Sequence, residues 1–171
     1  MTFQEFLRHS EQDRGVLAAL RQGLTPSREM LAWPYLAQFG GIGDSMRART
    51  VRTVAGLFAH HPSNCKKGNM GTTCLTLCLR RGGEKPWELM DFRRNRAIPL
   101  GPVARRFCWM LEADREEICE RVIRMVLFAK NERIPVNYAQ LEEDLTHWPR
   151  AREYWARSFW TTEKTAMEIK E

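Results

Sequence analysis

The side chains best suited to hold a metal lie close together in the first half of the sequence. His60, His61, Cys65, Cys74 and Cys78 fall within 19 positions. Zinc is held by cysteine and histidine, but paired zinc cysteines usually have two residues between them, whereas here the gaps are eight and three. Buried thiols and a histidine pair at a helix end are the simpler interpretation. We therefore expect no metal, and a metalloenzyme is an alternative that metal analysis would test.

Other catalytic patterns are equally weak. The glycine-rich run at 40–43 lacks the Lys-Ser/Thr of a phosphate-binding loop, and no serine stands in a nucleophile elbow. Glu142, Glu143 and Asp144 are successive residues of an expected helix, so they point in different directions unless one folds inward. The sequence predicts neither an enzyme nor a cofactor or small-molecule substrate.

Arginine is the residue type that stands out. There are 21 arginines against six lysines, and the net charge is +6. Between Arg47 and Arg106, 13 basic residues face only three acids. Guanidinium groups bind phosphate through two parallel hydrogen bonds, so this distribution favours a polyanionic partner, most simply a nucleic acid.

The elements that must position these arginines are predicted to be helices almost throughout. Val51, Val54, Ala55 and Phe58 follow helical spacing and indicate a helix of about four turns that ends near His61. The remaining signals predict a capping box at residues 2–5, a helix over 72–81, a helical turn from 86, and helices after 102, 114, 137 and 149. No alternation persists long enough to predict a sheet.

A break at 98–102, where Pro and Gly cluster, divides the chain. We predict an all-α fold of two small helical-bundle lobes joined by this short Pro/Gly linker. The expected units are a basic N-terminal lobe (1–97), a C-terminal bundle (98–160) and a frayed polar tail (161–171). Trp148, Trp155 and Trp160 are expected in the core, whereas Trp87 and Phe92 are weaker core candidates because they lie in the basic segment.

The cellular setting is predicted from what the sequence lacks. No apolar run approaches the roughly 20 residues of a membrane span, and the first 14 residues carry acids instead of an apolar core. Five cysteines are an odd number for a disulfide scaffold. We expect a reduced cytoplasmic protein that does not bind a membrane.

An ordered set of short motifs runs from about residue 13 to residue 160. It comprises Asp13-Arg14-Gly15 with the run at 19–23, the run at 54–62, Gly68-Asn69-Met70-Gly71, the run at 103–107, the run at 111–117, the run at 134–138, Leu141, Asp144-Leu145, Trp148, and 155–159. Together they resemble the CasB-type small subunit of the type I-E CRISPR surveillance complex, Cascade. The resemblance is poor over 82–96, and residue 22 is Gln where such proteins often have arginine.

The resemblance implies a non-catalytic, all-helical subunit of an antiviral defence complex. Two copies would lie head to tail and contact other Cascade subunits along the backbone that carries the crRNA. They would hold the guide–target duplex and the displaced, non-target DNA strand. Because R-loop formation is close to balanced, phosphate contacts of this kind can favour the open state.

The charge pattern and the resemblance together give ten candidate nucleic-acid-binding residues, which share a basic side chain within or near the matched motifs. Three of them, Arg47, Arg49 and Arg52, are expected on one face of their helix. Four of the ten are favoured, namely Arg21, Arg52, Arg105 and Arg106. The full set is Arg14, Arg21, Arg47, Arg49, Arg52, Arg105, Arg106, Arg124, Lys130 and Arg133.

A second reading is a helix-turn-helix regulator of duplex DNA. The helices expected over 137–160, with a turn at Trp148-Pro149, could form such a motif. Their nearly neutral charge and the absence of glycine from the turn weigh against it. A regulator would prefer one duplex site, whereas a Cascade subunit would bind single strands of any sequence.

Overall fold

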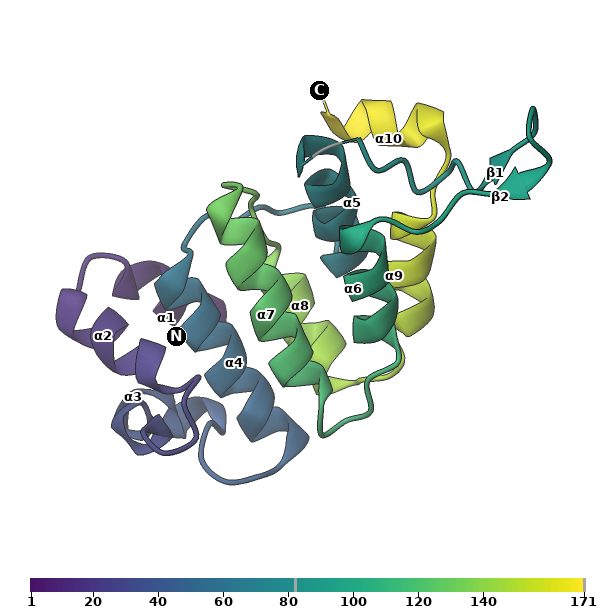
Figure 1. The fold of residues 1–171 in the computed structure, drawn as a ribbon. Helices are drawn as coiled ribbons and strands as arrows, with labels where there is room; N and C mark the ends of the chain where they lie inside the picture. The colour runs from purple at the N-terminus through teal and green to yellow at the C-terminus, as the bar shows by residue number, and fades with distance from the viewer. Residues whose placement is uncertain (82, 171) are drawn as a thin grey trace.

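The computed structural model describes residues 1–81 and 83–170. Within them the regular secondary structure is almost entirely helical, as the sequence predicts, with one small antiparallel hairpin (Figure 1). The elements in chain order are α1 (Phe3–Ser10), α2 (Arg14–Gln22), η1 (Glu29–Leu31), α3 (Trp33–Leu36), η2 (Ala37–Phe39), α4 (Met46–His60), α5 (Met70–Arg81), β1 (Met90–Asp91), β2 (Arg96–Ala97), α6 (Pro102–Leu111), α7 (Ile118–Asn131), α8 (Tyr138–Thr146), α9 (Arg152–Phe159) and α10 (Glu163–Lys170).

The first helix begins where the sequence predicts, and a further cap starts the second. Thr2 and Glu5 form the expected capping box, in which the Thr2 hydroxyl accepts the Glu5 N–H and the Glu5 carboxylate accepts the Thr2 N–H. The Asp13 carboxylate then accepts two backbone N–H groups in the first turn of α2. Such caps satisfy donors that a helix start leaves free. They fix where α2 begins, and α2 packs along α4.

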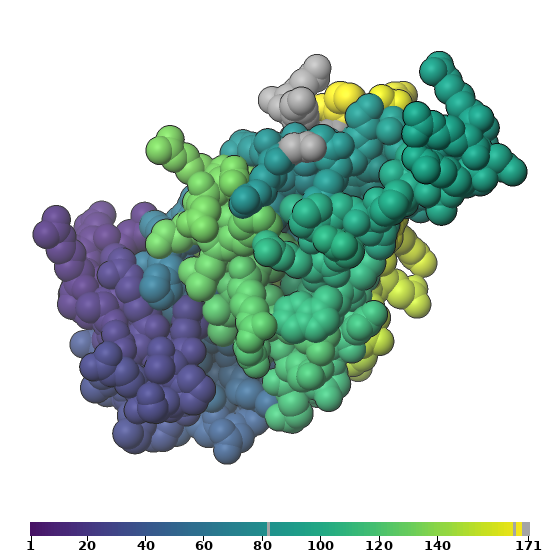
Figure 2. All heavy atoms as spheres, viewed as in Figure 1, coloured from purple at the N-terminus to yellow at the C-terminus, as the bar shows by residue number. Residues whose placement is uncertain are grey.

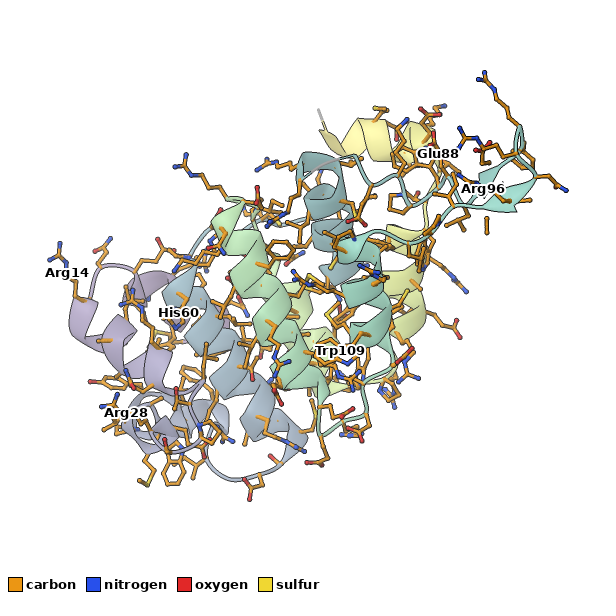
Figure 3. The ribbon with its side chains drawn as sticks, viewed as in Figure 1. Arg14, Arg28, His60, Glu88, Arg96 and Trp109 are labelled. Carbon is orange, nitrogen blue, oxygen red and sulfur yellow. The ribbon has the colours of Figure 1, made fainter. Side chains whose placement is uncertain are left out.

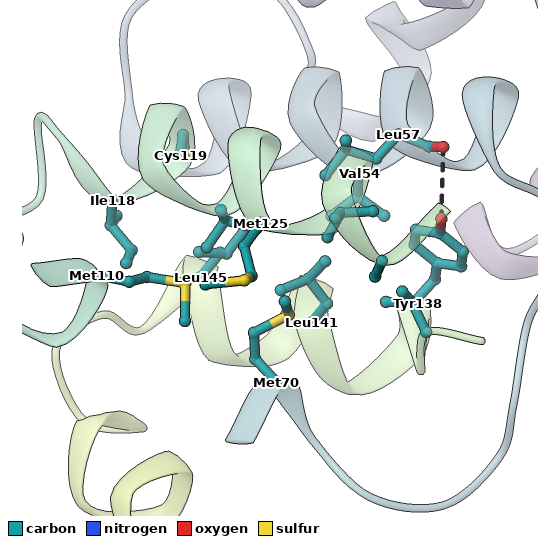
Figure 4. Close-up of a cluster of buried hydrophobic side chains, with 14 of the residues drawn as sticks. Val54, Leu57, Met70, Met110, Ile118, Cys119, Met125, Tyr138, Leu141 and Leu145 are labelled. Carbon is teal, nitrogen blue, oxygen red and sulfur yellow. Dashed lines mark hydrogen bonds between the residues drawn. The ribbon is translucent and has the colours of Figure 1, made fainter. Parts of the chain in front are cut away.

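Helix α4 is the centre of the molecule. Val51, Val54, Ala55 and Phe58 are fully buried or nearly so, which confirms the predicted helix and its apolar positions. Helix α2 covers one side of α4, and α7 and α8 cover another. The Tyr138 hydroxyl donates to the carbonyl oxygens of His61 (2.6 Å) and Leu57 (3.3 Å), so α8 is also tied to the end of α4 (Figure 4).

The C-terminal helices pack around α5, which contacts α6, α7 and α9. Trp148 and Trp155 are fully buried, as predicted, and Trp160 is partly buried. The indole N–H groups of these two residues have partners, since Trp148 donates to the Ala113 carbonyl oxygen (3.0 Å) and Trp155 donates to the Asp144 carboxylate (2.6 Å). The two tryptophans thus join the loop before α7 to α8 and α9.

The two predicted lobes share one core. Helix α5 precedes the predicted linker, yet it packs on α6 and α9, which follow it. Buried residues from α2 to α9 form one hydrophobic cluster. The division at residue 97 therefore does not coincide with a gap in the packing. The boundaries of the two units, at residues 97 and 160, stay a prediction.

The helical turn expected from Pro86 is wrong, because this segment leads into a hairpin. Strands β1 and β2 pair Met90 with Ala97 and Asp91 with Arg96. The Asp91 carboxylate accepts the N–H groups of residues 93 and 94, and Asn95 takes a left-handed conformation with φ of 48°. Asp and Asn stabilise turns in this way and compete with helix formation. The hairpin projects from the helical body (Figure 1).

The segment expected to be a frayed tail forms helix α10, which contacts α5. Glu171, the last residue of the predicted tail, lies outside the described residues. None of the helices in the described part of the chain is both long and apolar enough to cross a membrane.

Candidate nucleic-acid interface

The three candidate arginines of α4 do not share one surface. Arg47 forms an ion pair with Glu142 of α8 (Nη1–Oε1, 2.7 Å), and Arg49 forms one with Glu116 in the turn before α7 (Nη2–Oε1, 3.0 Å). An α-helix has 3.6 residues per turn, so the side chains at positions 47 and 49 point to nearly opposite sides of α4. The expectation that Arg47, Arg49 and Arg52 form one basic face is therefore wrong.

Arg52 lies inside the protein. Its side chain is 5% exposed and forms an ion pair with Glu29 (Nε–Oε2, 3.2 Å). Its Nη1 donates to the carbonyl oxygens of Gly41 (2.8 Å) and Gly43 (2.7 Å). The glycine-rich run is thus held by a buried guanidinium. Arg52 is therefore not part of the candidate interface, because its side chain is buried and its Nε and Nη1 groups are bonded within the fold.

The α2 candidates lie at two ends of that helix. Arg14 is exposed at its start, on the outer edge of the N-terminal helices (Figure 3). Near its end, Arg21 donates from Nε to the Ala59 carbonyl oxygen in the last turn of α4 (3.0 Å). The pKa of His60 is lowered by burial and by the positive charges of Lys130 and Arg21. Arg21 and Lys130 therefore lie close to the same helix end, where the backbone dipole favours cations.

The remaining candidates gather along α6 and α7. Arg105 and Arg106 are exposed on α6, and Arg124 and Lys130 are exposed on α7. Arg133 is exposed in the turn that follows α7. Arg81, at the end of α5, lies over the same Phe128 ring as Arg106. We call this set the basic stripe; it consists of Arg81, Arg105, Arg106, Arg124, Lys130 and Arg133.

Two aromatic rings hold the arginines of this region. The Arg121 guanidinium lies 4.3 Å from the centre of the Trp109 ring, and that of Arg124 lies 5.5 Å from it. The Phe128 ring has Arg106 at 4.7 Å and Arg81 at 4.6 Å. Cations at such distances are attracted by the ring electrons. The arginines are thereby ordered on the surface before any partner binds.

The rings and arginines surround a hollow between α6 and α7 of about 380 Å³. Figure 3 labels Trp109 where α6 and α7 lie side by side, and Figure 2 shows the same view of the molecule with all heavy atoms. The hollow is lined by Arg106, Trp109, Arg121, Arg124, Met125 and Phe128.

Sequence reasoning missed Trp109, Arg121 and Phe128. A signal was present, because Arg121, Arg124 and Phe128 stand at i, i+3 and i+7 and so share one helical face. Trp109 likewise follows Arg106 by three residues on α6. What the sequence does not contain is the contact between these two faces, which depends on how α6 packs on α7.

The residues considered for a metal have other roles. Cys74 and Cys78 are buried, and burial raises the pKa of both thiols well above the usual range. The His61 ring bonds through Nε2 to the Ile134 carbonyl oxygen (2.7 Å). Within residues 1–81 and 83–170, no three His, Cys, Asp or Glu side chains are grouped to hold an ion.

The three successive acids of α8 separate, as predicted for neighbouring helical residues. Glu142 pairs with Arg47, and Glu143 pairs with His147. Asp144 turns inward and accepts from Gln140 and Trp155, and burial raises the pKa of its carboxyl despite these hydrogen bonds. The acids therefore do not form a paired-carboxylate site.

Comparison with protein-family models decides the family. Residues 16–160 match the model described as CRISPR-associated protein Cse2. The chain belongs to the Cse2 family. This confirms the resemblance seen in the sequence motifs. A search of curated proteins found no match.

Solved structures of the Cse2 family share the fold. A CRISPR-associated protein of the Cse2 family from Thermus thermophilus has a TM-score of 0.69 and 22% identity, with 92% of this chain and 95% of that chain covered. CasB of M. ruber has a TM-score of 0.67 and 23% identity, with 99% and 98% covered. A chain of a CRISPR RNA-guided surveillance complex has a TM-score of 0.73 and 17% identity, with 98% and 94% covered.

Proposed function

We propose that this Cse2-family protein is a non-catalytic subunit of a type I-E Cascade complex that binds nucleic acid without sequence specificity. It bridges the crRNA-bearing backbone and stabilises the R-loop by holding the displaced non-target DNA strand. A second copy of the chain and other Cascade subunits are its protein partners, and it acts in antiviral defence in the cytoplasm. A chain of similar fold in a solved CRISPR RNA-guided surveillance complex supports this assignment.

The observation that carries the proposal is the basic stripe. Arg105, Arg106 and Lys130 are exposed and have no ion-pair partner among the described residues. Arg124 pairs with Glu120, but both side chains are more than 60% exposed, and exposed pairs contribute little. These cations can therefore exchange water or a weak partner for phosphate at small cost.

The stripe suits a displaced strand better than a chosen duplex site. Contacts to phosphate carry no sequence information, and each neutralised phosphate of a single strand steepens the salt dependence by about 0.7 in log–log slope. R-loop formation is nearly balanced, so a few such contacts favour the open state. Sequence recognition can then be left to the guide RNA.

The test is binding of the full chain to a fluorescent single-stranded DNA of mixed sequence, titrated at several salt concentrations beside the matching duplex. Wild-type protein should bind the single strand with steep salt dependence and little sequence preference. The Arg105→Glu/Arg106→Glu variant should have a lower affinity and a shallower salt slope, by about 0.7 for each phosphate that the variant no longer neutralises.

The matched control is Arg8→Glu/Arg28→Glu, which changes the charge by the same amount on two exposed side chains, one in α1 and one in the turn before η1. It should bind like the wild type. An equal decrease of affinity in both variants would mean that binding depends on the net charge of the protein and not on the position of the basic stripe. Tight binding of one duplex sequence would instead favour a helix-turn-helix regulator, and absence of binding would leave a protein–protein bridge.

A further inference from the structure

The hollow between α6 and α7 has a composition that phosphate binding alone does not explain. Three of the six residues that line it are arginines, none is acidic, and the other three are Trp109, Met125 and Phe128. All six lie in the described part of the chain. Its volume of about 380 Å³ is within the range of pockets that hold small molecules. Contacts with the arginines account for the presence of the rings, but they do not require that Trp109 stay 39% exposed.

The arginines around the hollow differ in how free they are. Arg121 is 12% exposed, pairs with Glu117 and also donates to the Trp109 carbonyl oxygen, so it holds the ring in place. Arg106 is exposed and has no ion-pair partner in the described residues. The exposed pair of Arg124 with Glu120 is weak enough to exchange for phosphate. Arg106 and Arg124 are thus the available anion-binding groups.

Trp109 is the ring that a ligand can reach. It is 39% exposed, although Phe107 and Met110 of the same helix are buried. Keeping a tryptophan partly in water forgoes the stability that its burial would give. Met125 and Phe128 add further apolar surface beside it.

We propose that this hollow binds one nucleotide of an unpaired strand, with the base against Trp109 and the phosphate between Arg106 and Arg124. The inference rests on the proposed function and adds a site for the base. A base in a duplex has its faces covered by its neighbours, whereas an unpaired base can stack on an aromatic side chain. The hollow therefore selects single-stranded over double-stranded nucleic acid.

A nucleotide fits this hollow better than an apolar segment of a protein partner. Burying an apolar side chain there would remove water from the arginines without giving them a counter-charge. A nucleotide supplies a flat apolar face for the rings and an anion for the guanidinium groups at the same time. Stacking tolerates any base, which agrees with binding that lacks sequence preference.

The experiment compares two probes that carry the same number of phosphates. One is a fluorescent oligothymidylate of about 15 nucleotides, and the other is an abasic oligonucleotide of equal length. Wild-type protein should bind the oligothymidylate about tenfold more tightly, since stacking of one base is worth a factor of this order. Trp109→Leu should lower the affinity for the oligothymidylate much more than the affinity for the abasic probe, because leucine keeps an apolar side chain in the hollow but offers no ring to a base.

Two further variants make the result specific. Trp109→Phe keeps a ring and should restore most of the preference for the oligothymidylate. Tyr154→Leu removes an aromatic ring that is 64% exposed on α9 and should have no effect on either probe. Thermal melting of each variant, followed by circular dichroism, checks that all remain folded. Competition by free thymidine monophosphate shows whether the hollow also accepts a nucleotide outside a strand.

The outcomes separate the two proposals. If wild-type protein binds both probes equally and Trp109→Leu changes nothing, the base site is refuted while phosphate binding by the stripe stands. If neither probe binds, the proposed function itself fails. If Trp109→Leu leaves both probes unaffected but prevents assembly with the other subunits, the hollow belongs to a protein interface and the inference is overturned.

Discussion

Arg52 and Arg106 both belong to the most basic part of the sequence, and they meet opposite environments in the fold. Arg52 is enclosed and bonds to two glycine carbonyl oxygens and to Glu29. Arg106 is exposed over the Phe128 ring. The first stabilises a loop, and the second is available to a ligand. Composition cannot distinguish them, because the difference lies in which element packs against each side chain.

Replacing Arg52 by Met should therefore damage stability and leave binding intact. The change leaves Glu29 and the carbonyl oxygens of Gly41 and Gly43 without their donor. Breaking a buried ion pair in this way costs about 3 kcal/mol or more. Urea unfolding should show that decrease in the free energy of unfolding, while the affinity for single-stranded DNA of the folded fraction should stay near that of the wild type.

Arg47→Met is the control for this prediction, because Arg47 is also paired but its side chain is 41% exposed. It should change the free energy of unfolding by less than about 1 kcal/mol. A lower single-strand affinity in folded Arg52→Met protein would return Arg52 to the interface.

At the scale of elements, α5 and α9 approach each other closely. Gly71 lies against the backbone of α9, and a Cβ built there would stand 2.0 Å from the Trp155 carbonyl oxygen. Glycine is needed at this position because any side chain would collide with the backbone of α9. The backbone conformation of Gly71 itself would not require glycine. The contact joins a helix of the predicted N-terminal lobe to one of the C-terminal bundle.

Gly71→Ala should force the two helices apart. Overpacking against rigid backbone costs about 3 kcal/mol, and the destabilisation should appear as a lower urea midpoint. Gly15→Ala is the matched variant, since Gly15 is an exposed helical residue whose Cβ would meet only the Asp13 side chain, at 3.2 Å. It should be neutral or stabilise α2 by up to about 1 kcal/mol. Equal effects of the two substitutions would contradict the proposed close approach.

The elements that the sequence predicts well are those with a strong local signal. The apolar spacing of α4 and the capping residues Thr2 and Asn137 each predict an element that the structure contains. The hairpin is missed because its strands are two residues long and its signal is the turn chemistry of Asp91 and Asn95. The α6–α7 hollow is missed for another reason, since it is formed by residues from two helices whose contact no local pattern contains.

At the scale of the whole molecule, the sequence predicts two lobes and the structure has one hydrophobic core. The predicted linker is a real break in the helical pattern, because residues 98–101, between β2 and α6, form neither helix nor strand. Two hydrogen bonds cross it. Glu84 accepts the N–H groups of Val103 (2.8 Å) and Ala104 (3.0 Å), so a residue before the hairpin caps the helix after it. A break in secondary structure is therefore not a break in packing.

This arrangement predicts that the protein unfolds in one cooperative transition. Leu20 of α2 is fully buried at the N-terminal side of the core, far along the chain from Trp155 of α9. Leu20→Ala should lower the free energy of unfolding by about 3 kcal/mol, as for other buried leucines. In a Trp33→Phe background, where the other five tryptophans lie at positions 87–160, fluorescence reports the C-terminal part of the chain. We expect Leu20→Ala to shift the urea midpoint of fluorescence as far as that of circular dichroism, because a shared core transmits the destabilisation to both halves. If the lobes were independent, the fluorescence midpoint would stay in place while circular dichroism divided into two transitions.

A cooperative result means that the surfaces of the two halves are held in a fixed relation. The residues of the basic stripe come from α5 on one side of the linker and from α6 and α7 on the other. The stripe is therefore already assembled when a strand arrives.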